Sequence, residues 1–208
     1  RIPAEIIRDI VLATSGLLNP EIGGASVRPY QPIGLWEGST AGRGDLTKYV
    51  TDTGNKLYRR GIYTFIKVTL PPPAMIIFDA SSRDHCEVKR QRTNTPLQAL
   101  IMLNDPAVLE ASRVLAERMA GRKLSTEDKI KELFQRIVCR APTEKEVGVL
   151  LAYYETELKK FSMNKSKAER VLNVGEYAHE KAVKIDQAAA LMRVISTIYN
   201  MEETITKS

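Results

Sequence analysis

The chain has 208 residues, of which 43% are hydrophobic and 27% charged, and its formal net charge is +6. This is the composition of a globular protein able to bury a sizeable core, as one large domain or a core with an appended subdomain. The positive charge is spread evenly along the chain rather than gathered into a basic stripe or tail, so we expect no nucleic-acid partner. The apolar runs are too short for a membrane span, so we expect none in this fragment.

Residues 3–18 predict the first helix, because apolar side chains recur at helical spacing after Pro3, which suits a first turn. Gly16 would end it. Residues 20–57 are rich in Gly and Pro and predict a long irregular arm. Three of its side chains would anchor the arm to the core: Tyr30, Leu35 and Trp36.

Residues 61–70 (GIYTFIKVTL) are rich in β-branched and aromatic residues and predict a short strand. Pro71, Pro72 and Pro73 would end it, since three fixed φ angles without amide donors cannot continue a ladder.

The next segment, from Asp79 to Arg92, concentrates charged residues immediately before an apolar helix. In one interpretation it is a site, where Asp84 and His85 form an acid–base pair and arginines clamp an anionic group. The candidate anion-binding residues are Arg59, Arg60, Arg83, Arg90 and Arg92. In the other it is a structural brace, where Asp79 and arginines 83, 90 or 92 are mostly buried, paired with each other or with backbone carbonyls.

A helix over 96–119 follows, with a capping box in which Thr95 is the N-cap and Gln98 reaches back. The segment Asn104-Asp105-Pro106 would break or kink it, with Asp105 capping its continuation. Its first half would bury Leu97, Leu100, Ile101 and Leu103.

Two further helices, over 126–139 and 144–161, would form an antiparallel hairpin, the first capped by Ser125 and the second by a Thr143–Glu146 capping box. Residues 162–182 predict a loop or loose helix, and 183–203 a last helix. The expected shared core comprises Leu100, Leu103, Leu115, Leu133, Phe134, Ile137, Leu151 and Tyr154.

These elements together predict a mainly α fold: an irregular multi-helix domain with a long Gly/Pro-rich arm and at most one short strand pair. We expect residues 1–120 to form a core of helix, arm, polar loop and capped helix, and 121–208 a helical subdomain packed on it.

Cysteine and histidine offer little chemistry. Cys86 and Cys139 lack haem-attachment or zinc spacing, so we expect no metal site and no cofactor in this fragment. Free, mostly buried thiols are favoured over a Cys86–Cys139 disulfide. His179 is expected to be solvated.

The chain resembles the C-terminal domain of unknown function of large exported proteins from planctomycetes and related bacteria. The likeness is strong over residues 1–120 and rests on PAEIIRDIVLATSGLLN (3–19), IGGASVRPYQPIGLW (22–36), YRRGIYTF (58–65), PPPAMIIFDASSRDHCEVKRQRTNTPLQALIMLNDP (71–106) and EASRVLAERM (110–119). RIVCRAPTEKEV (136–147) and NMEETIT (200–206) extend it more weakly. Those proteins often carry an N-terminal cytochrome c module, so the resemblance implies haem c in a full-length protein and an exported, periplasmic or cell-surface location.

Two functions follow as hypotheses. The first is a noncatalytic helical interaction module that packs against preceding domains of the same polypeptide. On this hypothesis we do not expect this fragment to be an enzyme. The second is an enzyme or binding domain acting on an anionic polysaccharide, sulfated or uronic, with the Arg59–Arg92 region as its site. Because the chain opens at Arg1 without Met, we expect a fragment of a longer protein whose ends say nothing of its compartment.

Overall fold

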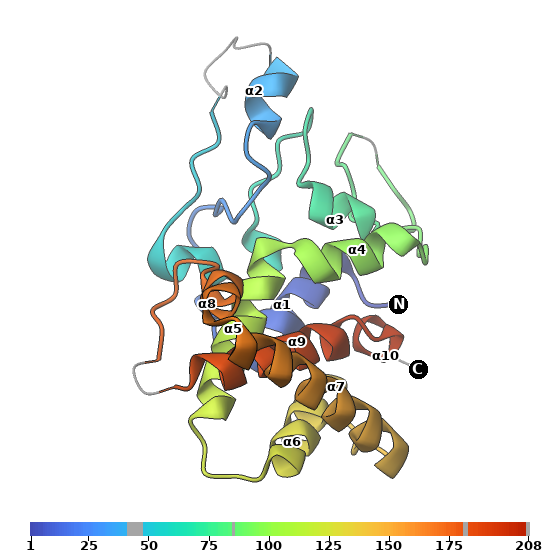
Figure 1. The fold of residues 1–208 in the computed structure, drawn as a ribbon. Coiled ribbons are helices and arrows are strands. Elements are labelled where there is room, and N and C mark those ends of the chain that lie inside the picture. Colours follow the sequence, from blue (N-terminus) through green and yellow to red (C-terminus); the bar gives the residue numbers. More distant parts are fainter. Residues whose placement is uncertain (41–47, 85, 181–182, 207–208) are drawn as a thin grey trace.

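The computed structural model describes residues 1–40, 48–84, 86–180 and 183–206. Within these ranges the chain is mainly helical and forms no sheet, and its extended pairing is limited to isolated bridges. The helices gather at one end of the molecule, and the arm with its short helix projects away from them (Figure 1). The mainly α prediction is confirmed.

The N-terminal half contains short elements separated by irregular chain. They are α1 (Ala4–Ser15), α2 (Leu35–Thr40), the 3-10 turns η1 (Gly54–Tyr58) and η2 (Gly61–Tyr63), and α3 (Pro73–Ile77). Gly16 ends α1 in the left-handed conformation, with a φ of 77°, as its position predicts. Trp36 anchors the arm: it is buried and packs edge-on against Tyr49 and beside Phe65.

The predicted strand at 61–70 is wrong. Residues 61–63 form η2, and extended pairing within the segment is limited to a bridge from Thr64 to Val27 and one between Lys67 and Leu70. The segment fails as a strand because no partner strand runs beside it in the described chain, and β-rich composition without a partner does not make a ladder.

The C-terminal half is mostly helical. It comprises α4 (Pro96–Asn104), α5 (Pro106–Ala120), α6 (Thr126–Val138), α7 (Glu144–Met163), α8 (Lys165–Leu172), α9 (Ile185–Tyr199) and α10 (Glu202–Ile205). The predicted break at 104–106 is confirmed, with Asp105 accepting from the amides of Ala107 and Val108. The predicted N-caps at positions 95, 125 and 143 are confirmed as well.

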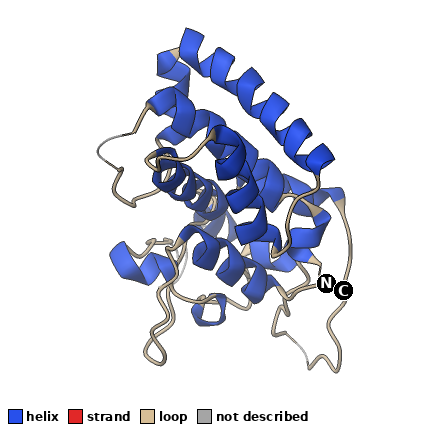
Figure 2. Cartoon of the chain, turned by 90° about the horizontal axis from the view of Figure 1, so that it is seen from below, coloured by secondary structure: helices blue, strands red, loops and turns tan. Residues whose placement is uncertain are grey.

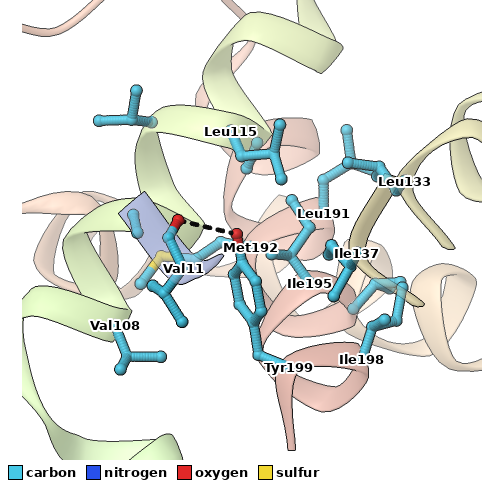
Figure 3. Packing of buried hydrophobic residues seen from close by; sticks show 14 of the residues in the cluster. Val11, Val108, Leu115, Leu133, Ile137, Leu191, Met192, Ile195, Ile198 and Tyr199 are labelled. Carbon is cyan, nitrogen blue, oxygen red and sulfur yellow. Dashed lines mark hydrogen bonds between the residues drawn. The ribbon is translucent and has the colours of Figure 1, made fainter. Parts of the chain in front are cut away.

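The core is built around α9, which packs against α5, α7, α8, α6 and α4. Figure 3 shows Leu191, Met192, Ile195 and Ile198 of this helix meeting side chains from α5 and α6. At its end the Tyr199 hydroxyl donates to the Val11 carbonyl of α1 over 3.4 Å and lies 2.6 Å from the Thr14 hydroxyl. One hydrophobic cluster thus joins the first helix to the last.

The two ends of the described chain lie side by side (Figure 2). The Ile2 amide donates to the Ile205 carbonyl over 3.0 Å. This hydrogen bond ties the residues before α1 to the end of α10.

Of the eight expected core residues, five are buried: Leu115, Leu133, Phe134, Ile137 and Tyr154. Leu151 is half-buried. The predicted burial of Leu100 and Leu103, and of Leu97 in the same helix, is wrong, because α4 turns its other face inward. Within the described ranges, no helix is both long and apolar enough to cross a lipid bilayer.

Candidate functional site

The carboxylate of Asp79 joins the two ends of the polar loop after α3 through hydrogen bonds to Thr93. Asp79 leaves α3 in the left-handed region, with a φ of 59°. Its Oδ2 accepts from the Thr93 amide over 2.7 Å, and both its oxygens lie within 3.0 Å of the Thr93 hydroxyl. Asp79 therefore ties the start of the loop to its end.

The expected burial of arginines beside Asp79 is wrong. Arg83, Arg90 and Arg92 are exposed, and Thr93 supplies the donors that an arginine was expected to supply. The physical reason is that the loop after Asp79 is exposed to solvent. A guanidinium group on this loop stays hydrated and so avoids the desolvation cost of burial. Arg90 instead reaches α1, where its Nη1 lies 2.9 Å from Glu5 Oε2.

The carbonyl-bracing role predicted for these arginines belongs to Arg59. Its buried guanidinium donates to the carbonyls of Glu21, Gly23 and Ala25 and lies 4.0 Å from the centre of the Tyr63 ring. Five donors in a planar fork allow one side chain to satisfy several carbonyls of an irregular arm. Arg59 is therefore part of the arm's internal support.

Two of the predicted anion-binding residues do come together. Arg90 and Arg92 line a hollow of about 240 Å³ with Lys89 and Arg1, and Asp79 lies in its wall. Burial is the largest single effect on Glu5 and raises the pKa of its carboxyl, but the hydrogen bond and charge of Arg90, the Glu5 backbone amide and the charge of Arg83 together lower that pKa below its usual value. Arg59 and Arg60 do not line this hollow, so the five arginines do not form one site.

The predicted acid–base pair is only half described. Asp84 is exposed, and its backbone amide lies 3.4 Å from the Ser82 hydroxyl. His85 lies outside the described residues, so the pair with Asp84 stays a prediction.

Both thiols are free, as expected, but neither is buried. Cys86 lies on the exposed loop. Cys139 is the left-handed C-cap of α6, with a φ of 65°, which places it in a surface turn rather than on the apolar face of the helix.

An apolar surface on α4 adjoins the basic loop. Leu97, Leu100 and Leu103 are 56%, 55% and 42% exposed, whereas Gln98 and Met102 are buried. Gln98 faces inward because its amide is fully used: Nε2 donates to the Ile77 carbonyl over 2.8 Å and Oε1 accepts from the Thr95 amide over 3.2 Å. We call the three exposed leucines the α4 face.

A buried ionic cluster on α5 was not predicted from the sequence. Arg113 is fully buried, and its Nη1 lies 3.1 Å from Glu117 Oε2 while its Nη2 lies 3.9 Å from Glu110 Oε1. The same guanidinium donates to the carbonyls of Val174 over 3.0 Å and Tyr177 over 2.6 Å. The cluster therefore pins the segment after α8 onto α5.

The two carboxylates complete that attachment. Glu110 accepts from the Tyr58 hydroxyl over 3.0 Å and from the Tyr177 amide over 2.8 Å. Together with burial, Glu110 raises the pKa of the Tyr58 phenol well above its usual value. The spacing E-x-x-R-x-x-x-E was visible in the sequence, but such a pattern usually marks a solvated helix face, so its burial was not predictable from spacing alone.

His179 lies at the solvent-facing edge of this cluster. Its Nδ1 lies 2.7 Å from Glu117 Oε1 and 3.2 Å from Arg113 Nη1, although its side chain remains 56% exposed. A carboxylate only accepts, so the 2.7 Å contact with Glu117 is a hydrogen bond when the ring proton is on Nδ1. The predicted exposure of His179 is confirmed, whereas its contacts with Glu117 and Arg113 were not predicted.

Among the described residues, no three His, Cys, Asp or Glu side chains are grouped closely enough to hold a metal ion.

A family model described as PSD1, protein of unknown function (DUF1553), matches residues 1–154. No match to the chain was found among curated proteins or among solved structures.

Proposed function

We propose that this chain, which belongs to the PSD1 family of proteins of unknown function (DUF1553), is a noncatalytic helical interaction module. The observation that carries the proposal is the α4 face, three leucines exposed on one helix next to a basic loop. Large apolar side chains grouped on a surface are typical of an interface. By resemblance, the module is part of a larger exported protein that carries a cytochrome c module.

The partner we propose is a preceding domain of the same polypeptide. Arg1 and Ile2 line the same hollow as Lys89 and Arg92, so a domain joined through Arg1 would lie beside the loop that leads into α4. The exposed cations at positions 83, 89, 90 and 92 favour a docking surface with apolar side chains and an acidic rim.

The test uses the full-length polypeptide carrying Leu97→Glu and Leu100→Glu. Both side chains are exposed, so the variant is expected to fold with an unchanged thermal midpoint. We expect it to expand in small-angle scattering and to be cut faster between domains by a protease, because a buried carboxylate at the interface is costly. Val149→Glu on α7, which is 63% exposed, is the matched control and should behave as wild type. Equal compactness of the α4 variant and the control would refute the proposal.

A second candidate is favoured by the hollow beside Asp79. Lys89, Arg90, Arg92 and Arg1 line it together, and guanidinium groups pair well with sulfates and carboxylates. In this alternative the chain binds an anionic polysaccharide, sulfated or uronic.

Calorimetry with a sulfated oligosaccharide and with an oligogalacturonate distinguishes the two candidates. Binding that falls at least tenfold in the Lys89→Gln/Arg92→Gln variant, with Arg60→Gln unchanged, would support the glycan candidate. Absence of binding at low ionic strength, or equal loss in both variants, would exclude this hollow as the site.

A further inference from the structure

A pocket of about 80 Å³ lies between α1, the arm, α3 and the α4–α5 junction. Most of its wall is apolar, including Ile7, Val11, Met75 and Val108. A groove of about 420 Å³ adjoins it and shares Tyr30, Pro72, Ala74, Ile101 and Asp105 with it. Pocket and groove therefore form one continuous concave region that none of the roles proposed above uses.

Three buried polar atoms in this region have no hydrogen-bond partner among the described residues: Arg8 Nε, Thr64 Oγ1 and Gln31 Nε2. Arg8 and Thr64 line the pocket, and Gln31 lines the groove. Buried polar groups are nearly always paired, so three together in one concavity point to an occupant.

All three unpaired atoms can donate. Arg8 Nε and Gln31 Nε2 carry only hydrogens to give, and the Thr64 hydroxyl can give one. The orientation of the Gln31 amide is fixed by Trp36, whose ring nitrogen donates to Gln31 Oε1 over 3.1 Å. An occupant of the pocket must therefore bring an acceptor oxygen to Arg8 and Thr64, whereas the Gln31 amide, which lies at the groove, can donate to water.

The charges that line the pocket favour a neutral carbonyl oxygen over a carboxylate oxygen. Arg8 shares the pocket with Asp105, whose carboxylate also caps α5. Burial raises the pKa of Asp105, while Arg8 and the amides of Ala107 and Val108 oppose that rise. A second carboxylate would share one guanidinium with Asp105, whereas a neutral carbonyl accepts from Arg8 without repulsion.

We propose that this pocket binds the carbonyl end of a neutral small molecule whose apolar part lies in the proline- and isoleucine-lined groove. The carbonyl accepts from Arg8 Nε and Thr64 Oγ1, and an apolar ring or short chain covers Pro72, Ala74 and Ile101. The pocket volume of about 80 Å³ is too large for a single water molecule to fill, because one water occupies only about 10–15 Å³ of cavity measured in this way.

The experiment titrates ¹⁵N-labelled protein with N-cyclohexylacetamide, cyclohexanecarboxylate and methylcyclohexane, which share a ring and differ in the head group. We expect the amide to shift the backbone resonances of residues around Thr64 and Ala74 at millimolar concentration. The carboxylate should bind at least fivefold more weakly at pH 7, and the hydrocarbon more weakly still. Preference for the carboxylate, or no shifts with 10 mM amide, would overturn the proposal.

Thr64→Val separates this site from a water-filled pocket. The substitution is nearly isosteric and removes a hydroxyl without a protein partner, so the fold should be retained with an unchanged or higher thermal midpoint. Affinity for the amide should fall at least fivefold. The exposed Thr69→Val is the matched control and should bind as wild type. Unchanged affinity in Thr64→Val would show that the amide binds elsewhere and would refute the assignment.

Discussion

The α5 cluster and the loop from Asp79 to Arg92 have similar residue types but opposite environments. In the loop, Arg83, Arg90 and Arg92 are exposed, and Arg90 makes one ion pair with Glu5. On α5, Arg113 is fully buried and all of its nitrogens have acceptors. Charge density in the sequence marked the first region, yet the second is where charges hold the fold together.

The difference follows from what surrounds each segment. Arg113 lies on a helix that is covered by α9 and by the segment after α8, so its cluster is satisfied within the protein by mutual ion pairs, backbone groups, the Tyr58 hydroxyl and His179. The loop residues are mostly polar and exposed, and hydration of their polar groups costs less than burial. In this chain the buried brace is therefore made by the charged residues of a covered helix, and the dense polar loop stays hydrated.

The largest effect should come from removing the buried cation. Arg113→Met leaves Glu110 and Glu117 buried without their charge partner, and we expect a loss of about 3–5 kcal/mol in the free energy of unfolding. Arg90→Met on the loop should cost about 0.2–1 kcal/mol. Urea titration of both variants provides the measurement. Equal losses would break the comparison, and partial rescue by adding Glu110→Gln and Glu117→Gln would sharpen it.

The next effect contrasts two leucines that sequence analysis placed in one core. Leu133 is fully buried on α6, so Leu133→Ala should destabilise by about 2–5 kcal/mol through lost transfer energy and a cavity. Leu100 on the α4 face is 55% exposed, so Leu100→Ala should change stability by no more than about 0.5 kcal/mol. Chemical denaturation of both proteins tests this, and a large cost at Leu100 would place α4 differently.

A smaller effect is expected where the loop does contain a brace. Asp79→Ala removes the acceptor for the Thr93 amide and hydroxyl, and should cost about 1–3 kcal/mol. Asp79→Asn should cost less, because asparagine can still accept one bond and tolerates the left-handed backbone. Asp84→Ala is the control on the same loop. A double-mutant cycle with Thr93→Val would show little coupling if the two residues do not act together.

Much of the fold was readable because its signals are local. Thr95, Ser125 and Thr143 cap helices as predicted, since a cap depends on residues three positions apart. The inward face of α4 was not readable, because PLQALIMLN is apolar on several sides and tertiary contacts of Gln98 decide its rotation. The strand at 61–70 failed for the same reason, since pairing depends on a distant partner.

The candidate site was less predictable than the fold. The sequence marked Arg90 and Arg92, which do line one hollow, but it could not show that Arg59 turns toward the arm. Arg8, Thr64 and Gln31 are far apart in the sequence and carry no motif, so only their placement around one pocket connects them.

The smallest expected effect on stability concerns a third ion network, which is partly exposed. On the surface at the start of α7, Arg140 lies 2.6 Å from Glu146 and 2.8 Å from Glu203 of α10. The hydrogen bond from Arg140, followed by that from the Thr143 amide, lowers the pKa of Glu146 to about 2 from its usual 4.5.

Because the folded-state pKa of Glu146 is the lower one, its contribution is present above pH 4.5 and is lost as the pH falls towards 2. We therefore expect the stability difference between wild type and Glu146→Gln to be constant from pH 7 to pH 5 and to shrink steadily below pH 4.5. Thermal unfolding at each pH gives the difference, and Glu155→Gln on the exposed side of the same helix controls for the loss of one carboxylate. A difference that grows on acidification would mean that Glu146 does not owe its low pKa to Arg140 and the capping box.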